Sequence, residues 1–133
     1  MDTKTLVSLQ KDKAHRFLQE ADDMLQQQRW DLAANRYYYA CYHIVHAIFI
    51  SNGIIVKTHD GTLTELGKHF ILTDKLDKKF GRFFARMIQL RIKADYNSIA
   101  EVSDVEVQEM APLSHEFVEN IEKIVTHHRV KSA

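Results

Sequence analysis

Residues 33–49 read AANRYYYACYHIVHAIF, and this stretch decides the fold. On a helix with about 100° per residue, its apolar side chains cover most of the circumference, which indicates the central helix of a bundle. The apolar positions are Ala33, Ala34, Tyr37, Tyr38, Ala40, Cys41, Ile44, Val45, Ala47, Ile48 and Phe49. Three of the small residues recur every seven positions and would let a neighbouring helix approach closely: Ala33, Ala40 and Ala47.

The remaining stripe of this helix is polar and aromatic. It consists of Asn35, Arg36, Tyr39, Tyr42, His43 and His46. A helix face exposed to water normally carries Lys and Glu, and this stripe has neither. Amphipathic aromatic side chains with His and Arg suit a subunit interface or a lined cleft, although they also occur at simple helix contacts.

The periodicity outside this stretch predicts an all-α, five-helix, up-and-down bundle in a single domain over residues 1–133. The helices are expected at about 4–28, 31–52, 61–72, from Asp74 or Asp77 to about Asp95, and from Ser103 toward a fraying tail at 129–133. The segments 54–60 and 96–102 are expected to be loops. Ser103 and Glu106 have the spacing of a capping box, and Pro112 is expected to kink the last helix.

The composition restricts the class of protein. Eighteen basic and eighteen acidic residues give a net charge of zero, which argues against a protein that coats DNA. Cys41 is the only cysteine and is expected to be a buried thiol in a reducing compartment. The N-terminus lacks a signal-peptide pattern. The longest apolar run, 37–50, is shorter than the ~18 residues of a membrane span, so a cytoplasmic protein is expected.

The zero net charge conceals a segregation of charge along the chain. Residues 57–93 contain nine Lys or Arg against four acids, whereas residues 94–122 contain eight acids and no Lys or Arg. A basic helix and an acidic helix that pack side by side would satisfy each other. The alternative is a positive surface that meets RNA or an acidic partner.

Arg91 lies on the apolar side of its own predicted helix. That side consists of Phe80, Phe83, Phe84, Met87, Leu90 and Ala94, and the opposite side of Lys78, Lys79, Arg82, Arg86 and Lys93. An unpaired buried guanidinium is costly, so Arg91 requires a negative group. The candidates are Asp95 one turn further on, a group of a second subunit, or a phosphate.

Four segments together resemble the HEPN domain family, the higher-eukaryote and prokaryote nucleotide-binding family, and in particular its small stand-alone prokaryotic members. The segments are ANRYYYACYH at 34–43, NGI at 52–54 followed by KTH at 57–59, RIKADY at 91–96, and Phe117-Val118. The order and spacing of the segments make the resemblance specific, and it spans about residues 10–125.

The resemblance implies a helical bundle that forms a homodimer, with the arginine helices of two subunits meeting at one composite site. Many family members are metal-independent RNases, often toxins, that use an Arg-x4-6-His motif. In that chemistry His transfers a proton while Arg stabilises the phosphate. The resemblance also implies a small nucleotidyltransferase as a frequent partner.

This sequence departs from the nuclease motif. Five, six and seven residues after Arg91 stand Tyr96, Asn97 and Ser98, and none is His. A tyrosine is a poor general base at neutral pH because its pKa is near ~10. Arg36 and His43 fit the spacing, but they lie on the central helix, where the family does not carry its catalytic pair.

Three functions therefore remain open. The first, which we prefer, is a dimeric nucleotide- or RNA-binding module that acts with a nucleotidyltransferase and does not cleave efficiently. The second is a metal-independent RNase toxin of a toxin–antitoxin pair, and the third a non-catalytic helical adaptor. The catalytic candidates are Arg91, Tyr96 and His59, although His59 could instead cap or pack the next short helix. The nucleotide-binding candidates are Arg91, Asp95, Tyr39, His43 and Arg36. Neither a metal site nor a cofactor is expected.

Overall fold

The regular structure of the protein is helical throughout the part that the computed structural model describes, residues 2–96 and 102–132. The helices are α1 (Thr3–Gln26), α2 (Trp30–Ser51), α3 (His59–Leu66), a π-helical turn η1 (Gly67–Ile71), α4 (Lys78–Tyr96) and α5 (Asp104–Ser132). The predicted all-α fold is therefore confirmed. Residues 97–101, expected to be part of a loop, lie outside the described residues.

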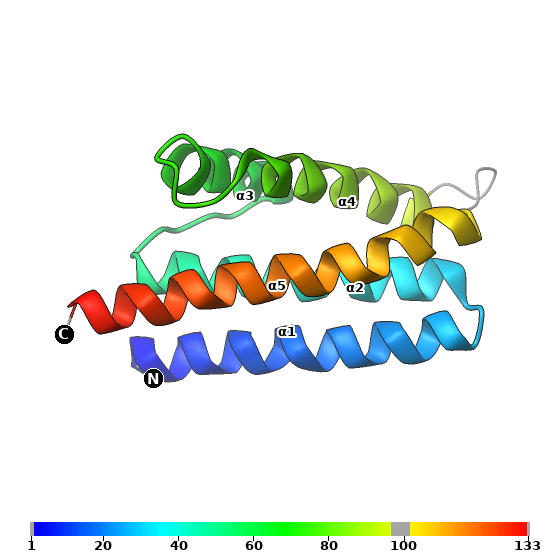
Figure 1. Ribbon diagram of the computed structural model, residues 1–133, viewed down its shortest axis with the longest axis horizontal. Coiled ribbons are helices and arrows are strands. Elements are labelled where there is room, and N and C mark those ends of the chain that lie inside the picture. Colours follow the sequence, from blue (N-terminus) through cyan, green and yellow to red (C-terminus); the bar gives the residue numbers. More distant parts are fainter. Residues whose placement is uncertain (1, 97–101, 133) are drawn as a thin grey trace.

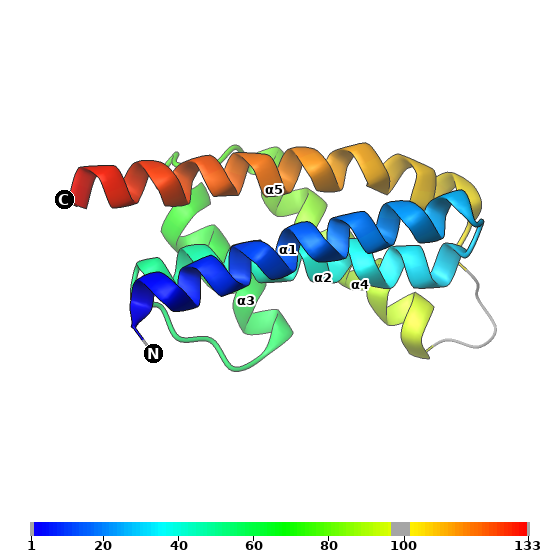
Figure 2. The ribbon, with the colours of Figure 1, turned by 90° about the horizontal axis from the view of Figure 1, so that it is seen from below.

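The central position predicted for α2 is confirmed. In Figure 1 the helices α1, α2 and α5 lie along the long axis of the molecule, and α3 and α4 lie above them. Seen from below, α4 crosses the bundle obliquely (Figure 2). The helix α2 packs against α1, α4 and α5. All eleven positions expected to be apolar and enclosed on α2 are buried.

The short third helix begins and ends earlier than expected. It was predicted over 61–72, but α3 starts at His59 and passes into the π-helical turn after Leu66. The early start has a local cause, because the Thr58 side chain accepts a hydrogen bond of 2.9 Å from the backbone N–H of Gly61. Capping by Thr58 leaves His59 in the first helical position, so the suggestion that His59 caps this helix is wrong.

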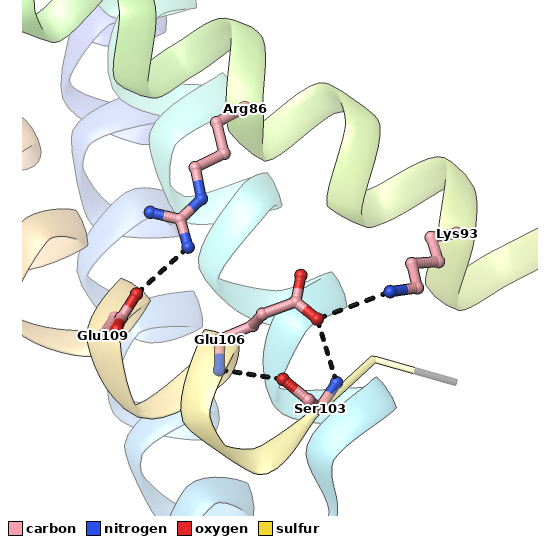
Figure 3. A network of polar contacts seen from close by, with 5 residues as sticks. All are labelled: Arg86, Lys93, Ser103, Glu106 and Glu109. Carbon is pink, nitrogen blue, oxygen red and sulfur yellow. Dashed lines mark hydrogen bonds and ion pairs between the residues drawn. The ribbon is translucent and has the colours of Figure 1, made fainter. Parts of the chain in front are cut away.

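The predicted capping box at the start of α5 is present. The backbone N–H of Glu106 donates to Ser103 Oγ at 3.1 Å, and the N–H of Ser103 donates to Glu106 Oε1 at 3.3 Å (Figure 3). Two donors at the helix start are thereby satisfied reciprocally. The helix continues through Pro112.

The segregated charges of α4 and α5 pair across the contact between these two helices. The pairs are Lys79 with Glu116 at 2.8 Å, Arg86 with Glu109 at 3.2 Å and Lys93 with Glu106 at 3.4 Å. Figure 3 shows the second and third pairs bridging α4 and α5. These contacts agree with the side-by-side interpretation of the charge pattern. They also place three of the basic side chains of α4 against carboxylates of the same chain.

Within residues 2–96 and 102–132, no helix is both long and apolar enough to cross a lipid bilayer.

Candidate functional site

Arg91 lies in a nearly enclosed position, as its place on the apolar side of α4 predicts. Its side chain is 13% exposed, and its Nε lies 3.3 Å from Oδ2 of Asp95, one turn further along α4. Its Nη2 donates to the hydroxyl oxygen of Tyr39 on α2 at 3.3 Å. The guanidinium carbon is 5.8 Å from the ring centre of Tyr38 and 5.9 Å from that of Tyr39. An acidic group of its own chain and two electron-rich rings therefore surround this buried charge.

Asp95 is in turn held by α2. The side-chain amide of Asn35 donates to both carboxylate oxygens of Asp95, at 3.1 and 3.3 Å. The oxygen of the same amide accepts a hydrogen bond of 2.7 Å from Arg36 Nη1. Arg36 Nε also donates to Glu20 of α1 at 3.2 Å. Hydrogen bonds and ion pairs therefore connect five side chains in a row that joins α1, α2 and α4. These are Glu20, Arg36, Asn35, Asp95 and Arg91.

His59 reaches the same place from the start of α3. Its Nδ1 is hydrogen-bonded to the hydroxyl of Tyr38, and its ring packs against Tyr38, Tyr39 and Tyr42 at centroid distances of 5.6, 6.4 and 5.1 Å. Partial burial lowers the pKa of His59, and the positive charge of Arg91 lowers it further. His59 is therefore a neutral imidazole at pH 7, close enough to Arg91 to interact with its charge.

The hydrogen bond between Tyr38 and His59 also determines which ring nitrogen carries the proton. Tyr38 is fully buried, and burial raises the pKa of its hydroxyl well above the ordinary range, so the O–H stays protonated. A buried hydroxyl needs an acceptor, and Nδ1 of a neutral imidazole can accept only when the proton is on Nε2. His59 then offers an N–H donor at Nε2. This arrangement suits the binding of an anion better than the abstraction of a proton.

Four of the predicted site residues come together: Arg91, Asp95, Tyr39 and His59. Arg36 joins the cluster indirectly, through Asn35. His43 lies one turn beyond Tyr39, where it is hydrogen-bonded to Gln10 at 2.7 Å and stacked on Phe17 with ring centres 5.3 Å apart. Tyr96 is the last residue of α4, and its side chain lies outside the described residues.

Three residues of the cluster, Asn35, Tyr38 and Glu20, were not predicted as site residues from the sequence. Asn35 was part of the polar stripe of α2, and its spacing of four from Tyr39 was an available signal that both lie on one face. Tyr38 was assigned to the core on its apolar periodicity, and nothing in that pattern indicates that its hydroxyl meets His59. Glu20 contacts the cluster only because α1 packs beside α2, which no local pattern predicts.

Metal binding has no evident site in the described part of the chain. In residues 2–96 and 102–132 no three or more His, Cys, Asp or Glu side chains are grouped so that they could hold a metal ion. The chemistry that the cluster can provide is that of a guanidinium, an imidazole N–H and tyrosine hydroxyls. These groups donate hydrogen bonds to oxyanions.

Comparisons with known proteins agree with the resemblance. A model of the HEPN domain matches residues 7–125. A UPF0332 protein of Thermotoga maritima is 30% identical over 113 residues, which cover 85% of this chain and 86% of that protein. Two proteins of Methanocaldococcus jannaschii named "Putative toxin" are 27% and 28% identical. The matches cover 84% and 68% of this chain, and 76% and 67% of those proteins.

Proposed function

Because the chain belongs to the HEPN domain family, we propose that it is the RNA- or nucleotide-binding component of a two-protein module of the toxin–antitoxin type. The site is the cluster around Arg91, and the ligand group that it recognises is a phosphate. The names of the two archaeal relatives support the assignment to a toxin–antitoxin module. The second protein of the proposed module is a small nucleotidyltransferase, a proposal that the family resemblance supports.

The observation that carries this proposal is the arrangement of Arg91 beside His59. The guanidinium is held in a fixed direction by Asp95 and Tyr39, and the imidazole is held by Tyr38. Both side chains border the same two tyrosine rings. A fixed guanidinium and a fixed N–H donor are the groups with which proteins hold phosphate oxygens.

The protein acts as a homodimer in this proposal. Ile92, the residue after Arg91 on α4, is a large apolar side chain that is 42% exposed and therefore accessible to a second subunit. A measurement of molecular mass by light scattering at micromolar concentration tests the dimer. A monomer at every concentration would remove this part of the proposal.

Binding to a short single-stranded RNA, followed by fluorescence anisotropy, tests the site. We expect Arg91→Ala to weaken binding about tenfold or more, since a charge-assisted contact to phosphate contributes roughly 1.5–3 kcal/mol. Arg82→Ala is the matched control, because Arg82 is an exposed arginine on the opposite side of the same helix. Equal affinities of wild type and Arg91→Ala would contradict the proposed site.

A metal-independent RNase is the second candidate, and the proximity of His59 to Arg91 favours it. We expect no efficient cleavage, because the hydrogen bond from Tyr38 leaves His59 without an accepting nitrogen toward the ligand. Incubation of the wild type with RNA in the presence of a chelator decides between the candidates. Cleavage that disappears in both Arg91→Ala and His59→Ala would establish the nuclease instead.

A further inference from the structure

We infer that Arg36 is a positioning residue for Arg91, which it reaches through Asn35 and Asp95 without touching the ligand. The two arginines lie on different helices, and Asn35 and Asp95 join them by the hydrogen bonds described above. The role in binding rests on the proposed function, whereas the structural linkage does not.

The side-chain amide of Asn35 could face Asp95 with either its NH2 group or its oxygen. Arg36 Nη1 donates to the oxygen at 2.7 Å, so the NH2 group is directed to the carboxylate of Asp95. The reversed amide would place an oxygen against a carboxylate and an NH2 group against a guanidinium. Both contacts would be repulsive, so Arg36 and Asp95 favour the same orientation of the amide, and the contact with Arg36 holds the amide in place from its oxygen end.

Asp95 in turn holds Arg91. The Asp95 side chain is 25% exposed, and Asn35 donates to both of its oxygens. Without that double contact the carboxylate could leave Arg91 for another staggered rotamer in contact with water. The amide therefore keeps Oδ2 beside Arg91 Nε, and this contact fixes the direction of the guanidinium.

Arg36 could alternatively serve only to join α1 to α2, since it pairs with Glu20 and its guanidinium carbon lies 5.7 Å from the Phe17 ring centre. Arg16 is a control for contact with Glu20 and the Phe17 ring alone, because it lies on α1 with both of these residues and does not join α1 to α2. It also approaches Glu20, at 3.8 Å, and its guanidinium carbon lies 5.6 Å from the same ring centre. Of the two arginines, Arg36 is the one that donates to Asn35.

The test compares Arg36→Met, Asn35→Ala and Arg16→Met by NMR of the arginine Nε–H groups. The Arg91 resonance is assigned by its loss in Arg91→Lys. We expect this resonance to shift or broaden in Arg36→Met and in Asn35→Ala, and to remain unchanged in Arg16→Met. Asn35→Ala leaves the Glu20 pair intact, so it remains informative if Arg36→Met does not fold. An unchanged Arg91 resonance in Asn35→Ala, or equal shifts in the two arginine variants, would overturn the inference.

Affinity for the short RNA provides a second readout that depends on the proposed function. A coupling of this indirect kind is expected to weaken binding about three- to tenfold in Arg36→Met, and not in Arg16→Met. Equal affinities of Arg36→Met and wild type would overturn the role in binding. If the wild type binds no RNA, the proposed function fails, while the NMR comparison still decides whether Arg36 positions Arg91.

Discussion

Burial and neighbouring charges determine the position and the protonation state of individual residues around Arg91. Arg91 sits among aromatic rings because the period of α4 places it there, and Asp95 neutralises it from one turn away. His59 and His43 are both kept neutral because burial lowers their pKa values. Under the proposed function, the phosphate meets the guanidinium of Arg91, whose charge Asp95 offsets, together with the neutral donors His59 and Tyr39.

The buried imidazole of His43 predicts a pH dependence of stability. Burial, reinforced by the charge of Lys13, lowers its pKa from 6.5 to about 4. Between these values the unfolded chain binds more protons at His43 than the folded chain. Titration of His43 therefore does not reduce the free energy of unfolding above pH 6.5, and it reduces that free energy progressively as pH falls toward 4. After allowance for the partial exposure of His43, the loss of unfolding free energy from this one group is roughly 1 kcal/mol.

Replacement by Phe removes the titrating group and keeps a ring against Phe17. Urea unfolding at several pH values should therefore show a shallower decline in His43→Phe than in the wild type. The decline should not vanish, because burial also lowers the pKa values of His46 and His59. Identical slopes in the two proteins would mean that His43 does not contribute.

Single helices owe their boundaries to a few polar side chains. Thr58 starts α3, and Ser103 with Glu106 starts α5. The ion pairs between α4 and α5 contribute little to the free energy of unfolding, because exposed ion pairs are worth about 0–1 kcal/mol each. Their main consequence is that part of the basic surface of α4 is already covered by carboxylates.

Removal of the cap at the start of α5 should destabilise the protein measurably. We expect Ser103→Ala to lower the free energy of unfolding by about 1 kcal/mol, because the N–H of Glu106 loses its acceptor. Chemical denaturation measures this loss. Ser8→Ala, an exposed position within α1, is the control and should leave stability unchanged or slightly raised. A loss of the same size in the control would argue against the capping role.

At the scale of the whole molecule, an aromatic stack holds α4 against α5. The rings of Phe84 and Phe117 are stacked with centres 5.6 Å apart, and both side chains are fully buried. Phe84 is also stacked on Tyr38 of α2, with ring centres 6.0 Å apart. This column of rings places α4 on α2, so it also supports the approach of Arg91 to Tyr39.

Truncation of this column should weaken the fold far more than truncation at the surface of the same helix. Phe117→Ala is expected to cost about 3–5 kcal/mol through lost burial and the cavity left behind. Leu113→Ala is the control, since Leu113 is 39% exposed, and its cost should be at most about 1 kcal/mol. Urea denaturation compares the two variants. Similar midpoints would show that the column is not a main source of stability.

The sequence by itself determined the elements and their faces. The apolar circumference of α2, the capping box of α5 and the pairing of Arg91 with Asp95 all follow from the period of a helix, which is a local property. The tertiary structure decided which of these faces meet. Asn35 and Asp95 are separated by 60 positions in the chain. His59 is close enough to feel the charge of Arg91 only because α3 begins beside Tyr38 and Tyr42 of α2. Contacts of this kind depend on how helices pack, and the spacing of residues within one helix shows which face is buried but not which residues of another helix that face meets.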